Sequence, residues 1–178
     1  EIYLKKGVFV MSKLKKIILS AMLLALLIVF SRFLSVKTPL LVISFSFIPI
    51  IISANILGPK YSTIIALLGD LIGALLFPFG AYFPGYTLSQ ALIGLIYGLF
   101  LYENENRKIS DGKFLIRLIL SSILALVGVG IFVTGIWVHI TAGKAYIAIL
   151  SARAITQLIM IPIQVVVMFT LRKLLKPA

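Results

Sequence analysis

Apolar residues run along this chain in long uninterrupted stretches, and polar residues gather between them. A helix needs about 20 consecutive apolar residues to cross a bilayer. One uncharged stretch, residues 71–102, is too long for a single helix, and it divides near Pro78 and Pro84 because proline removes a helix donor. The expected spans are residues 17–34, 41–57, 61–77, 86–101, 114–138 and 146–171. The pattern predicts an all-α integral membrane protein with six transmembrane helices.

Composition excludes a water-soluble fold. The chain has 178 residues, of which 61% are hydrophobic and 12% charged, whereas soluble domains are about 45–50% apolar and about 25% charged. A soluble fold of this length could not bury so much apolar surface. We expect one membrane domain, residues 14–178, after a cytoplasmic N-terminal segment, residues 1–13. Residues 1–10 are either a leader or appended stretch, or part of the native chain.

The net charge of +12 is distributed unevenly over the two ends of the predicted spans. With six spans, both termini lie on one side, together with thirteen of the seventeen Lys and Arg residues. The other side keeps only Arg32, Lys37, Lys144 and Arg153. Because cytoplasmic loops carry the excess of Lys and Arg, we expect both termini to be cytoplasmic and loops 35–40, 78–85 and 139–144 to be external. The basic composition is then a topology signal, and nucleic acid is not expected as a partner.

The sequence offers little for catalysis. It has no cysteine and only one histidine, His139, which excludes disulfides, thiolate sites and metal sites built on several imidazoles. No P-loop, GxSxG or HExxH pattern occurs, and only five residues are acidic. We therefore expect a protein that binds or passes a molecule, with no enzymatic activity, no metal and no cofactor of its own. His139 is expected to be a loop residue without a catalytic task.

Two charged residues fall inside predicted spans, where insertion of a charge costs about 2.5–3.5 kcal/mol. Asp70 lies between Gly69 and Gly73, a pair of small residues four apart that lets another helix approach. Arg153 lies about 12 Å from the outer end of its span at the rise of an α-helix. Either Asp70 and Arg153 neutralise each other, or Arg153 extends outward to the interface, or both mark a ligand pocket open to the outside.

Polar side chains follow one face of the fourth span and one face of the sixth. They are Tyr86, Gln90 and Tyr97 on the former, and Arg153, Gln157 and Gln164 on the latter. Such faces turn toward protein or water, not lipid. They are consistent with a pocket lining and equally with hydrogen bonds between helices, and Tyr97 is better explained by packing.

Aromatic and basic residues gather near the predicted outer surface, among them Arg32, Tyr86, Trp137 and Lys144. One interpretation is an interfacial aromatic belt beside exposed basic loops. The other is a mouth that attracts an anion and stacks a flat ring. An anionic ligand would enter against the membrane potential, at about 2.3 kcal/mol per charge per 100 mV. With no energy-coupling site of its own, the chain would need a partner, and Ala21 and Ala25 form a small-residue step suited to helix docking.

Several stretches resemble the substrate-binding (S) components of energy-coupling factor (ECF) transporters, and among them the folate-specific ones. The carrying stretches are residues 46–50 (SFIPI), 57–60 (LGPK), 69–74 (GDLIGA), 78–89 (PFGAYFPGYTLS), 94–98 (GLIYG), Arg153 and 161–163 (IPI). The resemblance covers residues 14–175, and the six-span layout is shared by all S components.

The resemblance implies that the chain captures a vitamin outside a bacterial cell and works in the cell membrane with a transmembrane coupling subunit and two ATPase subunits, which alone bind ATP. In the family, a small-residue pair on the first span contacts the coupling subunit, and here that pair is Ala21 and Ala25. The family's S component is also thought to topple in the membrane.

Folate combines a flat pterin with a tail of two carboxylates, and the candidate residues divide accordingly. Asp70 or Gln90 suits the pterin edge, Tyr86 or Trp137 its face, and Gln157 lies on the same helix face as Arg153. Arg153 is the first candidate for the tail, because arginine binds carboxylates through two parallel hydrogen bonds, with Arg32 and Lys144 as further candidates. The alternatives are an S component for riboflavin, niacin or a similar vitamin, a scaffold protein, and an intramembrane enzyme.

Overall fold

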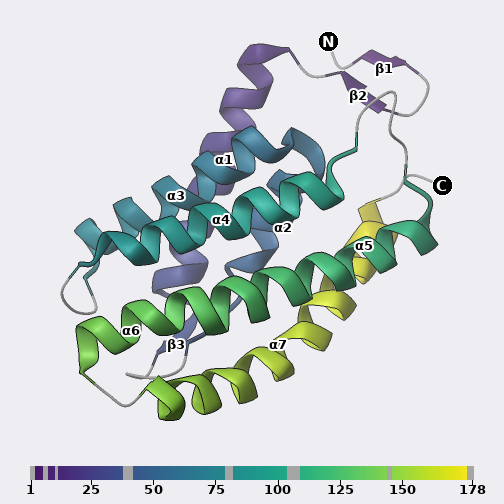
Figure 1. Ribbon diagram of the computed structural model, residues 1–178. Helices are drawn as coiled ribbons and strands as arrows, with labels where there is room; N and C mark the ends of the chain where they lie inside the picture. Colours follow the sequence, from purple (N-terminus) through teal and green to yellow (C-terminus); the bar gives the residue numbers. More distant parts are fainter. Residues whose placement is uncertain are drawn as a thin grey trace.

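The computed structural model describes residues 3–5, 8–10, 12–37, 42–78, 82–103, 109–143 and 146–175 (Figure 1). The regular structure of these residues is helical apart from two short antiparallel hairpins, β1–β2 and β3–β4. The elements are β1 (Tyr3–Lys5), β2 (Val8–Val10), α1 (Lys13–Arg32), β3 (Ser35–Lys37), β4 (Val42–Ser44), α2 (Phe47–Leu57), α3 (Pro59–Leu76), α4 (Pro84–Leu101), α5 (Asp111–Ile123), the π-helix η1 (Leu124–Val133), α6 (Thr134–Ala142) and α7 (Tyr146–Leu175).

Five helical segments within the described residues are long and apolar enough to cross a membrane. They are Lys13–Arg32, Pro59–Leu76, Pro84–Leu101, Asp111–Thr141 and Tyr146–Lys173. Each coincides with one predicted span, so the prediction of an α-helical, multi-pass membrane protein is confirmed. The span count of six stays a prediction, because the remaining apolar helix, α2, has only 11 residues.

The expected helix over residues 41–57 is shorter than predicted. α2 begins only at Phe47, and the residues before it belong to β4 and a turn. The Ser46 amide donates to Ser44 Oγ over 3.1 Å, a local bond of the kind by which serine competes with helix formation. The β-branched residues Val42 and Ile43 favour the extended hairpin instead.

Glycines set how closely α1, α3 and α4 approach one another. A methyl group added at Gly94 on α4 would lie 2.5 Å from the Ser62 carbonyl oxygen on α3, and Ser62 Oγ donates to the Gly94 carbonyl over 2.8 Å. On the other face of α3, a methyl at Gly69 would meet the Leu27 side chain and one at Gly73 the Arg32 guanidinium, both from α1. The small pair flanking Asp70 therefore admits α1, as the spacing predicted.

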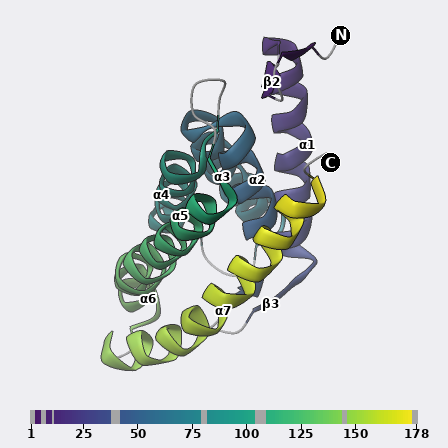
Figure 2. The ribbon, with the colours of Figure 1, turned by 90° about the vertical axis from the view of Figure 1, so that its right-hand side faces the viewer.

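α5, η1 and α6 follow one another without a break, and α7, which contacts all three, runs back at an angle to them (Figure 2). η1 packs against both α4 and α7 and so lies between the two helices that carry the predicted polar stripes. Pro162 lies inside α7. The buried core includes Leu27, Ile51, Phe114 and Leu118.

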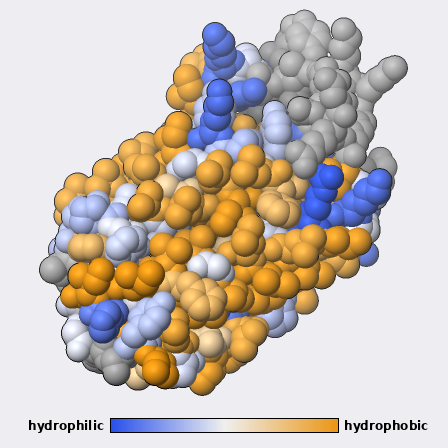
Figure 3. Space-filling view, viewed as in Figure 1, coloured by the Kyte–Doolittle hydropathy of each residue, from blue (hydrophilic) through white to orange (hydrophobic). Residues whose placement is uncertain are grey.

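Apolar side chains cover much of the visible surface, while hydrophilic ones gather toward its ends, over the starts of α1 and α5 (Figure 3).

At one end, Arg172 of α7 pairs with Glu103, and its Nε donates to Asp111 over 3.2 Å. Its guanidinium also lies 3.9 Å from the centre of the Phe114 ring. We call this end the Arg172 end. The opposite end, where α1, α3 and α6 finish and α4 and α7 begin, is the Arg32 end.

Candidate functional site

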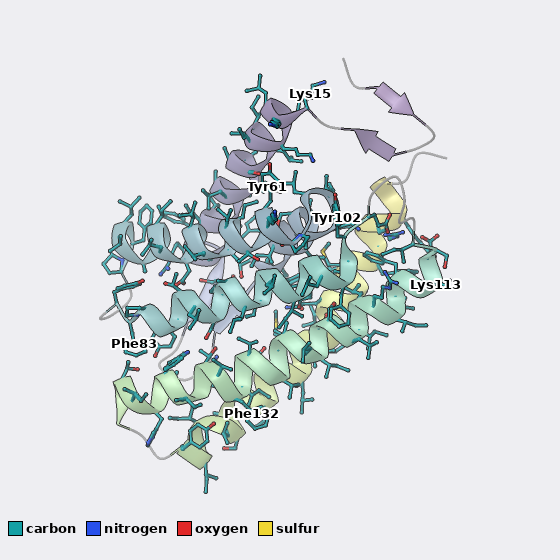
Figure 4. The ribbon with its side chains drawn as sticks, turned by 45° about the horizontal axis from the view of Figure 1, so that its top comes forward. Lys15, Tyr61, Phe83, Tyr102, Lys113 and Phe132 are labelled. Carbon is teal, nitrogen blue, oxygen red and sulfur yellow. The ribbon has the colours of Figure 1, made fainter. Side chains whose placement is uncertain are left out.

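The predicted ligand-binding residues of the described chain lie toward the Arg32 end or along α4 and α7 leading from it. Figure 4 shows Phe83 near the start of α4, with Tyr102 and Lys113 at the opposite end of the molecule. Three groups of side chains line this region: an ion pair at α1 and α3, an aromatic cluster at α4 and α6, and a polar row on α7.

Arg32 and Asp70 pair with each other. Their charged atoms lie 3.6 Å apart, with the side chains 9% and 21% exposed, and Arg32 also donates to the carbonyl of Asp70 over 3.2 Å and to that of Phe77 over 3.4 Å. Thr87 of α4 donates to the Asp70 carboxylate over 2.7 Å, and the hydroxyl of Tyr82 lies 3.2 Å from that of Thr87. One carboxylate thus joins the ends of α1 and α3 to the start of α4.

This pairing excludes one of the interpretations drawn from the sequence. The one in which Asp70 and Arg153 neutralise each other is wrong, because Asp70 has Arg32 as its ion-pair partner and Arg153 bonds to a backbone carbonyl. Asp70 and Arg32 remain candidate ligand contacts, but both already have partners within the protein.

The aromatic cluster covers the start of α4. The Phe83 ring lies 5.9 Å from the Tyr86 ring and 5.6 Å from the Trp137 ring, centre to centre. The Trp137 indole donates to Ser89 Oγ over 3.1 Å, and the Tyr86 hydroxyl lies 2.8 Å from that of Thr141. These bonds fix Tyr86 and Trp137 between α4 and α6. The cluster gives the Arg32 end the flat apolar faces that stack aromatic rings.

Arg153 and Gln157 both contact Gly130 of η1. Arg153 is partly buried, and its Nε donates to the Gly130 carbonyl over 2.8 Å. A methyl group at Gly130 would lie 2.9 Å from the Gln157 side-chain nitrogen. The polar face of α7 is therefore directed at the protein interior, as helical spacing predicted.

The two polar stripes meet at their deeper ends. Tyr97 Oη donates to Gln164 Oε1 over 2.7 Å, and these residues are 1% and 3% exposed. This bond joins α4 to α7, so for Tyr97 and Gln164 the interpretation as packing and interhelical hydrogen bonding is the correct one. Any ligand site along the stripes must lie on the Arg32 side of this pair.

The other predicted residues have varied surroundings. Gln90 is partly buried on α4, and Lys144 lies outside the described residues. Ala21 and Ala25 are exposed on α1. His139 was expected in a loop but lies in α6, which continues to Ala142, and its ring packs edge-on against that of Tyr146 at 5.9 Å.

Sequence reasoning missed the residues that hold the candidates in place, chiefly Thr87, Ser89 and Gly130. Thr87 lies one position from Tyr86 and Ser89 one position from Gln90, but a small hydroxyl or a glycine in an apolar helix is too common to single out. The sequence has no signal that separates Gly130 from the other glycines of the predicted spans.

Three comparisons with known proteins agree. The pattern of the family described as ECF transporter, substrate-specific component, matches residues 15–172. The chain is 37% identical over 159 residues to the Folate transporter FolT of Clostridium novyi, covering 89% of this chain and 88% of that protein. It is 34% identical over 156 residues to the Folate transporter FolT of Leuconostoc mesenteroides, covering 85% and 80%.

Among solved structures, the crystal structure of FolT bound with folic acid matches with a TM-score of 0.75 and 37% identity. The match covers 87% of this chain and 89% of that chain. The family is one of substrate-binding transport components and not of enzymes, which agrees with the sequence-based expectation. The fold, the length of the match and the level of identity together show that this chain belongs to the family of substrate-specific components of ECF transporters.

Proposed function

We propose that this chain captures folate at the Arg32 end and delivers it into the cell as part of an ECF transporter. The observation that carries the proposal is Arg153, a cation held partly buried on a membrane helix below the Tyr86–Trp137 cluster. A charge in this position is expensive unless it faces water, protein or a ligand. The FolT relatives, which share more than a third of their residues with this chain over most of its length, make folate the first candidate ligand.

The described side chains match the chemistry of folate. The Nε of Arg153 is bonded to Gly130, and its two Nη groups suit a carboxylate of the glutamate tail. Tyr86 and Trp137 offer faces for the pterin ring, and the amide of Gln90 offers donors and acceptors for its edge. Gln157, one turn from Arg153 on the same face of α7, is placed with the tail. Asp70 would have to loosen its bonds to Arg32 and Thr87 before it could contact the pterin.

The other predicted basic residues take secondary places in this proposal. Arg32 reaches a ligand carboxylate only by giving up Asp70, so we assign the ion pair first to holding the helix ends. Lys144, predicted for the external loop before α7, keeps its proposed role in attracting the anionic tail.

The proposed orientation places the Arg32 end outside and both termini in the cytoplasm of a bacterial cell. The excess of Lys and Arg near the Arg172 end supports this orientation. α2 would bring the number of spans from five to six. Its 11 residues extend only about 16 Å, which is about half the hydrocarbon thickness. In this arrangement residues before α2 complete the crossing on the Arg32 side.

The proposed partners are a transmembrane coupling subunit and two ATPase subunits, which supply the energy for uptake. Ala21 and Ala25 support this, because they lie exposed on α1, and only Leu23 and Leu27 of that helix are buried. A helix face with two small residues four apart lets another helix approach closely. ATP would be bound only by the partner subunits, and folate would be the transported ligand.

Equilibrium binding of radiolabelled folate to the purified protein in detergent tests the proposal. We expect folate to bind more tightly than riboflavin or niacin, and Arg153→Ala to weaken folate binding by roughly tenfold or more, the loss of a charged hydrogen bond. Lys173→Ala removes a positive charge from the same helix at the Arg172 end and should leave binding unchanged. Tighter binding of another vitamin would assign this chain to that vitamin, and equal effects of the two substitutions would remove Arg153 from the site.

A further inference from the structure

The backbone opposite Arg153 has an unusual conformation. η1 comprises ten residues of π-helix within an otherwise α-helical segment, whereas π-helix generally occurs as single-turn bulges, which are frequent at functional sites. The segment is apolar and includes Gly128 and Gly130. It packs between α4 and α7, the helices that carry the polar stripes.

Gly130 makes two contacts that together determine the position of the polar row on α7. Its carbonyl accepts from Arg153 Nε over 2.8 Å. Its Cα is covered by the Gln157 amide, since an added methyl would lie 2.9 Å from Nε2 and 3.3 Å from Cδ of that side chain. Arg153 and Gln157 are one helical turn apart, so a single residue of η1 holds both.

The bond to Nε limits how Arg153 can bind an anion. Within the described residues, neither Nη1 nor Nη2 of Arg153 has a hydrogen-bond partner. A carboxylate binds a guanidinium through two parallel bonds, and with Nε bonded to Gly130 the remaining pair is Nη1 and Nη2. The guanidinium is therefore oriented to receive a carboxylate end-on.

We infer that Gly130 is a positioning residue for the anionic end of the ligand: its carbonyl orients the Arg153 guanidinium, and its lack of a side chain lets Gln157 lie flat beside it. The inference rests on the proposed function, because it assigns the ligand's carboxylate to Arg153. It concerns a residue that touches no ligand and acts through two that do.

Two glycines of η1 provide a matched pair of substitutions. A methyl at Gly130 would press on the Gln157 amide, whereas one at Gly128 would meet only Leu124, at 3.7 Å. We expect Gly130→Ala to displace the Gln157 amide from its place beside Gly130, and through it to disturb the Arg153 guanidinium one turn away on the same helix face. Gly128→Ala changes the same helix by the same group without touching the polar row.

The experiment measures the binding of folate and of a folate analogue whose two tail carboxylates are amides, using full-length protein. Gly130→Ala should weaken folate binding roughly tenfold while changing binding of the uncharged analogue by less than about twofold. Gly128→Ala should change either ligand by less than about twofold. The selective loss of the charged ligand distinguishes positioning of Arg153 from a general loss of structure.

A second background keeps the test decisive if Gly130→Ala folds poorly. In a Gln157→Ala protein there is room for the methyl, so adding Gly130→Ala should cost less than about twofold in folate binding, a non-additive result. Equal costs of Gly130→Ala in both backgrounds, equal effects of the two glycine substitutions, or equal losses for both ligands would overturn the inference. Failure of the wild-type protein to bind folate would instead overturn the proposed function, and the inference with it.

Discussion

At the scale of single residues, the two cations at the Arg32 end have different surroundings. Arg32 pairs with a carboxylate and two backbone carbonyls, so its charge is compensated within the protein. Arg153 has one backbone carbonyl and no ion-pair partner within the described residues. A cation without a counter-ion at membrane depth is a functional-site candidate. For this reason we assign ligand binding to Arg153 and stabilisation of the helix ends to Arg32.

The Arg32–Asp70 pair predicts a specific pattern of stability. Arg32→Ala leaves the Asp70 carboxylate partly buried without its counter-ion, and we expect a loss of about 1–3 kcal/mol in the free energy of unfolding. Asp70→Asn in the Arg32→Ala protein removes the uncompensated charge and should recover part of that loss. Thermal unfolding of the wild type, Arg32→Ala, Asp70→Asn and the double variant in one detergent measures both effects. Strictly additive costs would show that the two residues do not interact.

At the scale of elements, small residues rather than large ones set the arrangement of the helices. Lipid gives no hydrophobic driving force between apolar helices, so close packing and hydrogen bonds hold them together. Gly69 and Gly73 receive α1, Gly94 and Gly98 receive α3, and Gly130 receives the polar row of α7. The candidate site thus depends on helices whose spacing is set by glycines, which lie against backbone at Gly94 and Gly98 and against side chains at the other positions.

Because α3 and α4 approach closely at Gly94, we expect Gly94→Ala to lower the free energy of unfolding. The added methyl would lie 2.5 Å from the Ser62 carbonyl, and backbone cannot move aside as a flexible side chain can, so we expect a cost of about 1–3 kcal/mol. Gly112→Ala, whose methyl meets nothing within 4 Å, is the control and should not lower the melting temperature. If the two variants have the same melting temperature, the α3–α4 contact is looser than the structure indicates.

Because Ala21 and Ala25 lie on an exposed face of α1, we expect a substitution there to disrupt assembly with the coupling subunit without affecting folate binding. Ala25→Trp places a large ring on the proposed docking surface, away from Asp70 and Arg153, and should abolish co-purification with the coupling subunit while folate binding stays unchanged. Met22→Ala makes an exposed residue of the same helix smaller and should leave assembly intact. Normal assembly of Ala25→Trp would place the docking surface elsewhere on the molecule.

At the scale of the whole molecule, the two ends differ in chemistry. At the Arg172 end, ion pairs of Arg172 with Glu103 and Asp111 join the end of α7 to the residues around the start of α5. The Arg32 end presents an aromatic cluster above Arg153. The proposed capture of an anion at the Arg32 end agrees with this difference between the two ends.

Absence of native cysteine makes the orientation directly measurable. Single cysteines replace Leu34, which is exposed at the Arg32 end, and Gly112, which is exposed at the Arg172 end. In intact cells, a membrane-impermeant thiol reagent should label Leu34→Cys, and should label Gly112→Cys only after the membrane is opened. The reverse pattern would invert the proposed topology.

The order of apolar and polar residues was enough to predict the membrane class, five of the helices and the polar faces of α4 and α7, because lipid imposes length, apolarity and helical periodicity on each span independently of its neighbours. The resemblance in the Gly-Asp and Phe-Pro-Gly stretches also predicted the family correctly. Three features became apparent only in the folded chain: Asp70 pairs with Arg32, Tyr97 donates to Gln164, and residues 42–44 form a strand. These outcomes depend on which helices meet and at what height, and helix contacts in lipid are set by the fit of small residues across distant parts of the chain, which no local pattern specifies.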